Sequence, residues 1–212
     1  MIKAVIFDMD GLMFDTERLY RQAWIETGKE LSLNITVQDE DAIRGVNKTE
    51  SRRIFKEKFG EAFDFDSARN TVFAKVQAQL AINVPHRPGL LALLNELKNR
   101  HIPMAVASST ERSQVIKNLE GANVREYFDV LICGDMVSNS KPHPEIFQKA
   151  AEALGQPPQY CLALEDSFNG IRAAAKAQCI TVMIPDLDKA NAEMQELCYK
   201  VLPSLNKVIE LL

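Results

Sequence analysis

The stretch "AVIFDMDGLMFDTE", residues 4–17, begins with a short apolar run and then places two carboxylates, Asp8 and Asp10, two residues apart and before a glycine. Acidic residues are poor strand formers, so a strand over 3–8 either simply stops here or presents both carboxylates to a ligand. An EF-hand calcium loop is excluded, because its fifth and sixth positions would be Leu12 and Met13. The rest of the sequence has to decide between the two alternatives that remain.

The composition narrows the classes of partner. The chain has 212 residues, of which 46% are hydrophobic and 25% are charged, as in a soluble globular protein with one domain and a small insert or second domain. The net charge of −4 predicts neither nucleic acid nor a membrane surface as a partner. No apolar run approaches the roughly 20 residues that span a bilayer, and no signal peptide is visible, so we expect a cytoplasmic protein. The sequence carries no signal for oligomeric state, and a monomer is the default expectation. The four cysteines and three histidines lack the spacing of a zinc site.

Five short apolar runs predict β-strands, and each run ends in polar or turn residues. They cover residues 3–8, 102–109, 129–135, 161–166 and 180–185. Continuous rather than alternating apolarity is typical of strands that are buried on both faces of a parallel sheet. Helical patterns lie between the strands, over 89–100, 111–122, 142–155 and 170–178. This alternation predicts an α/β fold with a doubly wound parallel sheet.

One long segment interrupts the alternation. After the first predicted strand, about 65 residues contain helical patterns and no convincing strand, over 17–31, 39–45, 48–60 and 65–80. A normal crossover needs only about 10–20 residues, so we expect a helical cap domain inserted after the first strand. The predicted domains are a core of residues 1–15 and 83–212 and a cap of residues 16–82. The cap is expected to open and close on hinges near residues 14–18 and 80–86.

Polar residues follow several of the predicted strands. Ser108 and Ser109 end the second strand, Glu165 and Asp166 end a later one, and Lys141 stands where a loop enters a helix. In an open α/β sheet, ligands bind beyond the carboxyl ends of the strands, which would bring these side chains to one crevice. Clustered carboxylates repel one another unless a cation offsets their charge. Oxygen ligands alone favour a hard cation, and Mg²⁺ is the leading candidate.

Four motifs occur in order along the chain: "DMDGLMFDTE", "VASST", "SKPHPEIF" and "LEDSFNGIRAA". On these motifs the chain resembles the haloacid dehalogenase superfamily, and within it the β-phosphoglucomutase-like phosphatases and mutases that carry a helical cap. The resemblance covers essentially the whole chain. It implies a Rossmann-like core, a Mg²⁺ cofactor and a phosphatase that acts on a small phosphorylated metabolite, most simply a sugar phosphate.

The resemblance also implies roles for single residues. Asp8 would be the nucleophile that forms an aspartyl-phosphate. Asp10 would protonate the leaving oxygen as general acid and then activate water as general base. Ser108 would donate a hydrogen bond to a phosphoryl oxygen, helped by the backbone amides of Ser109 and Met9.

The charges of the site have implied roles as well. Lys141 would offset charge between the phosphate and Asp8. The implied ligands of Mg²⁺ are Asp8, the backbone carbonyl of Asp10, Asp166 and Glu165, the last either directly or through water. Together these groups would position and neutralise a transferring phosphoryl group.

Each of these residues has a structural alternative. Ser108 could be the N-cap of the helix that follows, and Lys141 could be a solvated loop lysine. His143 is expected to be a loop histidine rather than a catalyst, and Gly170 to serve the entry of a helix rather than a ligand. Glu17 either contacts substrate or only begins the first helix of the cap.

A basic run in the predicted cap gives a candidate for a distal substrate contact. Arg44, Lys48 and Arg52 stand at a spacing of four and could share one helical face, which is usually only a solvated face. The segment "RGVNK", residues 44–48, nonetheless matches the cap loop that β-phosphoglucomutase-like enzymes point at substrate. Lys48 is therefore predicted to contact the far end of the substrate.

Two departures from the mutase pattern favour hydrolysis. The sugar-phosphate mutases carry a histidine where this chain has Tyr20, and an arginine where it has Lys48. Lysine cannot grip a phosphate with two parallel hydrogen bonds as arginine does, and a mutase must hold a bisphosphate by both ends. A β-phosphoglucomutase-type isomerase stays as an alternative, and so does a protein that binds a phosphorylated ligand without chemistry.

Overall fold

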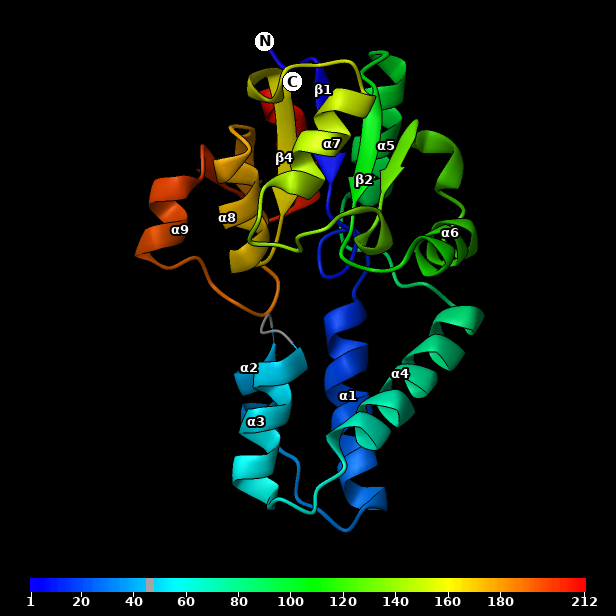
Figure 1. Ribbon diagram of the computed structural model, residues 1–212. Coiled ribbons are helices and arrows are strands. Elements are labelled where there is room, and N and C mark those ends of the chain that lie inside the picture. Colours follow the sequence, from blue (N-terminus) through cyan, green and yellow to red (C-terminus); the bar gives the residue numbers. More distant parts are fainter. Residues whose placement is uncertain (45–47) are drawn as a thin grey trace. The chain divides into compact units, whose positions relative to one another are not determined.

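The structure is a computed structural model that describes residues 1–44 and 48–212 (Figure 1). Two compact units make up the chain: Met1–Asp15 with Val84–Leu212, called here the sheet unit, and Thr16–Asn83, called the helical unit. Residues 45–47, in the predicted substrate loop, lie outside the described residues. Within the described ranges, none of the helices combines the length and the apolar character that crossing a lipid bilayer requires.

The sheet unit is built on six parallel strands in the order β3-β2-β1-β4-β5-β6. They are β1 (Ala4–Phe7), β2 (Met104–Ala107), β3 (Val130–Ile132), β4 (Cys161–Glu165), β5 (Ile180–Met183) and β6 (Lys200–Val201). In Figure 1 the blue β1 lies between the green β2 and the yellow β4. The chain winds outward from β1 through β2 to β3 and then returns to the other side at β4. The carboxyl end of β1 is therefore the point where the strand order reverses, where ligands bind in such sheets. The predicted doubly wound α/β fold is confirmed.

The strand register brings two of the predicted site residues to one level. Phe7 of β1 pairs with Leu164 of β4, so the next positions along the two strands are Asp8 and Glu165. The Asp8 amide donates to the Leu164 carbonyl at 3.0 Å, which continues the ladder one residue beyond β1. Side chains at the same level of neighbouring parallel strands share a face of the sheet. The two carboxylates therefore leave the sheet side by side.

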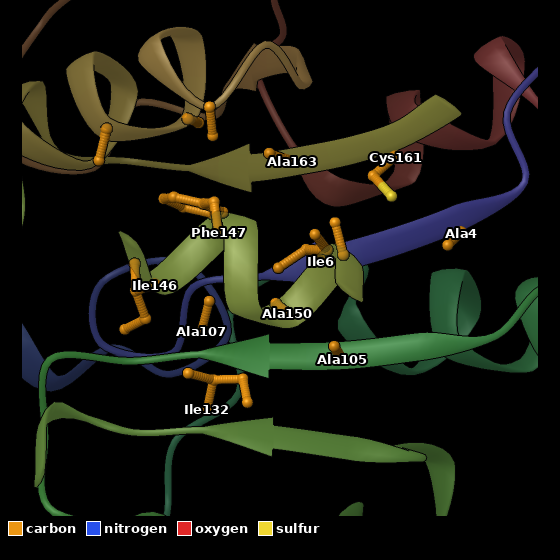
Figure 2. Packing of buried hydrophobic residues seen from close by; sticks show 14 residues of the cluster. Ala4, Ile6, Ala105, Ala107, Ile132, Ile146, Phe147, Ala150, Cys161 and Ala163 are labelled. Carbon is orange, nitrogen blue, oxygen red and sulfur yellow. The ribbon is translucent and has the colours of Figure 1, made fainter. Parts of the chain in front are cut away.

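The helices of the sheet unit include α7, which sets the position of the Lys141 loop. They are α5 (Leu90–Asn99), α6 (Arg112–Gly121), α7 (Glu145–Ala153), α8 (Phe168–Lys176) and α9 (Ala192–Leu197), with 3₁₀ turns η1 (Arg125–Tyr127), η2 (Gly134–Met136), η3 (Pro158–Tyr160) and η4 (Leu205–Leu211). Figure 2 shows Phe147 and Ala150 of α7 packed over Ala105 and Ala163 of the strands. Small strand residues let the helix approach the sheet closely, and Phe147 is completely buried there. This packing fixes the start of α7.

The helical unit has a core of its own, made largely of aromatic side chains. Its helices are α1 (Thr16–Glu30), α2 (Val37–Ile43), α3 (Lys48–Phe59) and α4 (Phe65–Ile82). Phe55 is 1% exposed, and its ring centroid lies 4.9 Å from that of Trp24, 5.6 Å from that of Phe65 and 5.7 Å from that of Phe63. Offset and edge-on contacts of this kind stabilise beyond the area that they bury. Phe55 is the centre of this cluster.

The strands and the hinge segments can be compared with those that the sequence predicts. All five predicted strands are present, but β6 was not predicted, because the exposed pair Lys200–Val201 gives no apolar run. In the predicted hinge segments, the Asp15 amide donates to the Pro85 carbonyl at 2.9 Å and the Arg87 amide to the Met13 carbonyl at 2.8 Å. These bonds tie residues 13–15 and 85–87 to each other within the sheet unit. The role of the helical unit as a cap stays a prediction.

We predict that Phe55→Ala lowers the free energy of unfolding of the helical unit by about 3–5 kcal/mol. The reason is the cavity that it leaves among the rings of Trp24, Phe59, Phe63 and Phe65. Urea unfolding followed by tryptophan fluorescence measures this, since Trp24 is the one tryptophan of the chain and lies in the same core. Phe73→Ala is the matched control, because Phe73 of α4 is 42% exposed. Equal losses for the two variants would contradict the cluster as the core of this unit.

Candidate active site

The turn after β1 presents Asp8 and Asp10 in different directions. Asp8 continues the sheet and is 7% exposed. Gly11 follows with a φ of 80°, a left-handed conformation that suits glycine, and its amide donates to the Phe14 carbonyl at 2.9 Å. The Asp10 carboxylate accepts a hydrogen bond from the Thr110 hydroxyl at 2.9 Å. Asp10 therefore faces the loop after β2, while Asp8 faces β4.

Lys141 joins three segments that are far apart in sequence. Its ammonium Nζ lies 2.5 Å from Asp8 Oδ1 and 2.6 Å from Glu165 Oε1, and it donates to the Ala107 carbonyl at 3.0 Å. The Lys141 side chain is 7% exposed. This is a buried ion pair with all three ammonium donors used, so the alternative of a solvated loop lysine is wrong.

Glu165 is fully buried, and both of its oxygens accept hydrogen bonds. Oε1 accepts from Lys141, and Oε2 accepts from the Asp166 amide at 3.1 Å, the Ser167 amide at 3.1 Å and the Ser167 hydroxyl at 3.0 Å. A Cβ on Gly170 would lie 1.8 Å from Glu165 Oε1. Gly170 thus leaves the space that this carboxylate fills, a role that the sequence did not predict. The arrangement makes Glu165 an anchor for Lys141.

Three carboxylates could hold a metal ion together. One oxygen each of Asp8, Glu165 and Asp166 lies within 4.8 Å of the others, and all three residues are buried. The Asp10 side chain is outside this group, as expected if only its backbone carbonyl were a ligand. Both Glu165 oxygens already accept hydrogen bonds, as expected if Glu165 contacted an ion through water rather than directly.

Burial and charge set the protonation of the ion pair. Burial raises the pKa of Asp8 well above its ordinary value, the charge of Lys141 opposes this, and Glu165 and Asp10 add to the rise. Burial disfavours the charged form of Lys141, but the attraction of Asp8 and Glu165 outweighs it and raises the pKa of Lys141. Lys141 is therefore a permanent cation in this site.

The loop after β2 supplies hydroxyl groups. Ser108 is 1% exposed, and its hydroxyl oxygen accepts a hydrogen bond from the Thr110 amide at 3.1 Å. The N-cap of α6 is Glu111, so the alternative of Ser108 as a helix cap is wrong. Ser109 is exposed, and a Cβ on Gly134 would lie 2.1 Å from the Ser109 carbonyl oxygen. This close approach of backbones packs the loop against the segment after β3.

The predicted cap residues lie in the helical unit. Lys48 is 52% exposed and forms an ion pair with Asp66 at 2.7 Å, and Arg52 binds the same carboxylate at 2.9 Å. Arg44 is the C-cap of α2 and pairs with Glu40, so it does not share a helical face with the other two cations. The possibility of one shared helical face is excluded, because α2 ends at Ile43 and α3 begins at Lys48.

Glu17 and Tyr20 lie on α1. Glu17 is in the first turn, where an acidic side chain is stabilised by the helix dipole. Both residues are partly buried. The structure brings Asp8, Lys141, Glu165 and Asp166 together in the sheet unit, while a role of Lys48 or Glu17 at substrate stays a prediction.

Sequence reasoning missed two groups that support the site. Thr110 binds both Asp10 and Ser108, and its position after two serines was the available signal. Glu145 accepts hydrogen bonds from two amides of the loop that carries Lys141. His143 accepts from the Glu145 amide at 3.3 Å, in agreement with its interpretation as a loop histidine.

Residues 2–178 match the haloacid dehalogenase-like hydrolase family. The chain belongs to this family. A phosphorylated carbohydrates phosphatase of Thermotoga maritima is 31% identical over 176 residues, which cover 83% of this chain and 82% of that protein. The crystal structure of CbbY from Rhodobacter sphaeroides in complex with phosphate superposes with a TM-score of 0.78 at 28% identity, over 98% of this chain and 96% of that chain.

One relative is much longer than this chain, and only a small part of it matches. The Arabidopsis thaliana protein SUPPRESSOR OF QUENCHING 1, chloroplastic, is 34% identical over 192 residues, which cover 85% of this chain and 18% of that protein. Together these matches confirm the predicted family, fold class and enzyme class, a phosphoric monoester hydrolase.

We predict that Gly170→Ala destabilises the protein by about 1–3 kcal/mol or more, because the new methyl group overlaps the buried Glu165 carboxylate. Denaturant unfolding measures the loss. Gly121→Ala is the matched control within a helix, since its Cβ would meet only the Val84 side chain at 3.2 Å. A Gly170→Ala protein as stable as the Gly121→Ala protein would refute the close packing of Glu165 on α8.

Proposed function

We propose that the chain is a Mg²⁺-dependent phosphatase that hydrolyses a small phosphorylated metabolite, first of all a sugar phosphate, through an aspartyl-phosphate on Asp8. One observation carries this proposal: Asp8 stands at the carboxyl end of β1, with its carboxylate held 2.5 Å from Lys141 Nζ and beside Asp166. The relative named a phosphatase of phosphorylated carbohydrates supports the substrate class. The related structure that holds phosphate supports an anionic ligand.

The donor set fits a hard divalent cation. Asp8, Glu165 and Asp166 offer three buried carboxylates within 4.8 Å, and Lys141 supplies one positive charge against them. Oxygen ligands of this kind suit Mg²⁺, and Asp8, Asp166 and the Asp10 backbone carbonyl would hold it. When bound, Mg²⁺ would supply positive charge that neutralises the phosphoryl oxygens and keeps Asp8 ionised.

The first half-reaction transfers the phosphoryl group to the protein. An Asp8 oxygen attacks phosphorus while the bond from phosphorus to the ester oxygen breaks. Asp10 gives a proton to the leaving oxygen, so the alcohol departs neutral. Ser108 and the amides of Ser109 and Met9 would donate hydrogen bonds to the phosphoryl oxygens, and Lys141 would offset their charge.

The second half-reaction restores the protein. The Asp10 carboxylate takes a proton from water, and the water oxygen attacks the phosphorus of the aspartyl-phosphate. The bond between phosphorus and the Asp8 oxygen breaks, which releases inorganic phosphate and the free carboxylate. The Thr110 hydroxyl, which donates to Asp10 at 2.9 Å, orients this carboxylate between the two steps.

The distal contact belongs to the same proposal. Lys48 would bind the far end of the substrate in exchange for its ion pair with Asp66, and Glu17 would contact a substrate hydroxyl. Exposed ion pairs contribute little to stability, so such an exchange costs little. A single lysine favours a monophosphate over the bisphosphate that a mutase must hold.

We predict that Asp8→Asn abolishes phosphate release, because an amide oxygen does not replace the carboxylate as nucleophile. The measurement is release of inorganic phosphate from p-nitrophenyl phosphate and a panel of sugar phosphates and nucleotides, with Mg²⁺ or with EDTA. Asp129→Asn is the control, because Asp129 is exposed and lies at the amino-terminal ends of the strands, where it binds the Met104 amide. Full turnover by Asp8→Asn would exclude the mechanism. Isomerisation of β-glucose 1-phosphate without phosphate release would instead assign a mutase.

We predict that Mg²⁺ raises the thermal unfolding midpoint and that Asp166→Asn removes most of the rise. A ligand at 100 times its Kd stabilises the folded state by about 2.7 kcal/mol, which is roughly 5–10 °C for a chain of this size. Differential scanning fluorimetry with and without EDTA measures the shift for the natural chain, Asp166→Asn and Asp129→Asn. Equal shifts in all three proteins would place the cation elsewhere.

A further inference from the structure

The loop that carries Lys141 needs a fixed conformation, because the ammonium has to meet both Asp8 and Glu165. It runs over residues 137–144, between η2 and α7, and the Lys141 ammonium at its centre meets Asp8 and Glu165. Loops vary in conformation unless side chains or hydrogen bonds fix them. Within the loop, the His143 amide donates to the Ser140 carbonyl at 3.0 Å. That hydrogen bond fixes residues 140–143 only. Residues 137–139, which precede it, need a separate anchor.

Glu145 supplies this anchor. Its carboxylate accepts hydrogen bonds from the Ser138 amide at 2.9 Å, the Asn139 amide at 2.9 Å and the Asn139 side-chain amide at 3.2 Å. Because Glu145 is the first residue of α7, these bonds tie the beginning of the loop to its end. Lys141 lies between the two points that are joined.

The contacts of Glu145 with residues 138–139 are called the clasp below. Lys149, one turn further along α7, adds to it. Its ammonium lies 2.8 Å from Glu145 Oε1 and donates to the Met136 carbonyl at 2.8 Å. The Lys149 hydrogen bond and the donated amides of Ser138 and Asn139 lower the pKa of Glu145 to about 2. The carboxylate is therefore ionised whenever the enzyme is folded at ordinary pH.

The opposite face of α7 is anchored in the core. Phe147 packs against the sheet (Figure 2). Its ring centroid lies 5.1 Å from Lys141 Nζ. A cation over an aromatic ring is attracted to its face. One helix thus holds Lys141 in two ways, through Phe147 beside the ammonium and through Glu145 around the loop.

We propose that Glu145 is a positioning residue for Lys141, which acts by clasping residues 138–139 and so fixes where the ammonium meets Asp8. The proposal rests on the proposed phosphatase function for its kinetic readout. Groups that orient a catalytic residue typically change activity by about 10-fold to 100-fold when they are removed. A helix-stabilising glutamate without this role would change stability and leave turnover alone.

Glu145→Gln tests the clasp, because the amide has one acceptor oxygen where the carboxylate has two. We expect kcat for p-nitrophenyl phosphate to fall about 10-fold to 100-fold with a smaller change in KM. Glu152→Gln is the control, since it makes the same change at an exposed position of α7. Glu145→Asp keeps both oxygens and should recover part of the loss. Equal kcat values for Glu145→Gln and Glu152→Gln, both folded at the assay temperature, would overturn the proposal.

Two further readouts separate positioning from general damage. If Glu145 acts through Lys141, adding Glu145→Gln to Lys141→Ala lowers the residual kcat no further. Acetylation of Lys141 by acetic anhydride, followed by mass spectrometry, should be slow in the natural chain and in Glu152→Gln and several-fold faster in Glu145→Gln. This second readout needs no turnover. If the natural chain releases no phosphate, the proposed function fails, but the acetylation rates still test the clasp. An equal acetylation rate of Lys141 in the natural chain and in Glu145→Gln would refute the clasp.

Discussion

The buried ammonium of Lys141 is the interaction on which the site depends. It lies 2.5 Å from Asp8 and 2.6 Å from Glu165 and donates to the Ala107 carbonyl, so one charge joins β1, β2 and β4. Removing one partner of a buried ion pair typically costs about 3–5 kcal/mol, because the other charge stays buried and unpaired. The conformation of the loop, the rotamer of Glu165 and the ionisation of Asp8 are therefore set together.

Glu165 and Asp166 are neighbours in sequence but differ in their surroundings, because β4 ends at Glu165. Glu165, its last residue, is fully buried, and its oxygens bind Lys141 and the amides that begin the next turn. Asp166, one residue further, is 9% exposed. In the proposed phosphatase, fixed dipoles and charges of this kind would stabilise a transferring phosphoryl group without reorganising during the reaction. The sheet supplies the fixed carboxylates, and a loop held by α7 supplies the cation.

The sequence predicted the sheet and its carboxylates because both leave local signals. Continuous apolar runs mark buried parallel strands, and the acids of the first and fourth motifs stand where two of those runs end. Supporting contacts leave no such signal: Thr110 binds an acid 100 residues away, and Glu145 binds backbone amides that any sequence has. Gly170 was interpreted as a helix entry, because only the folded structure shows the carboxylate that needs its space. The spacing of Arg44 and Lys48 misled, since a count of four assumes one continuous helix.

The proposed function depends on phosphorylation of Asp8. The most direct measurement is to quench the enzyme in acid during turnover of p-nitrophenyl phosphate, reduce it with borohydride and map the peptides by mass spectrometry. Borohydride converts an aspartyl-phosphate to homoserine and leaves a free aspartate unchanged. We expect homoserine at Asp8 and none at Asp10, and only when substrate is present. Phosphate release with an unreduced Asp8, or with homoserine at Asp10, would contradict it.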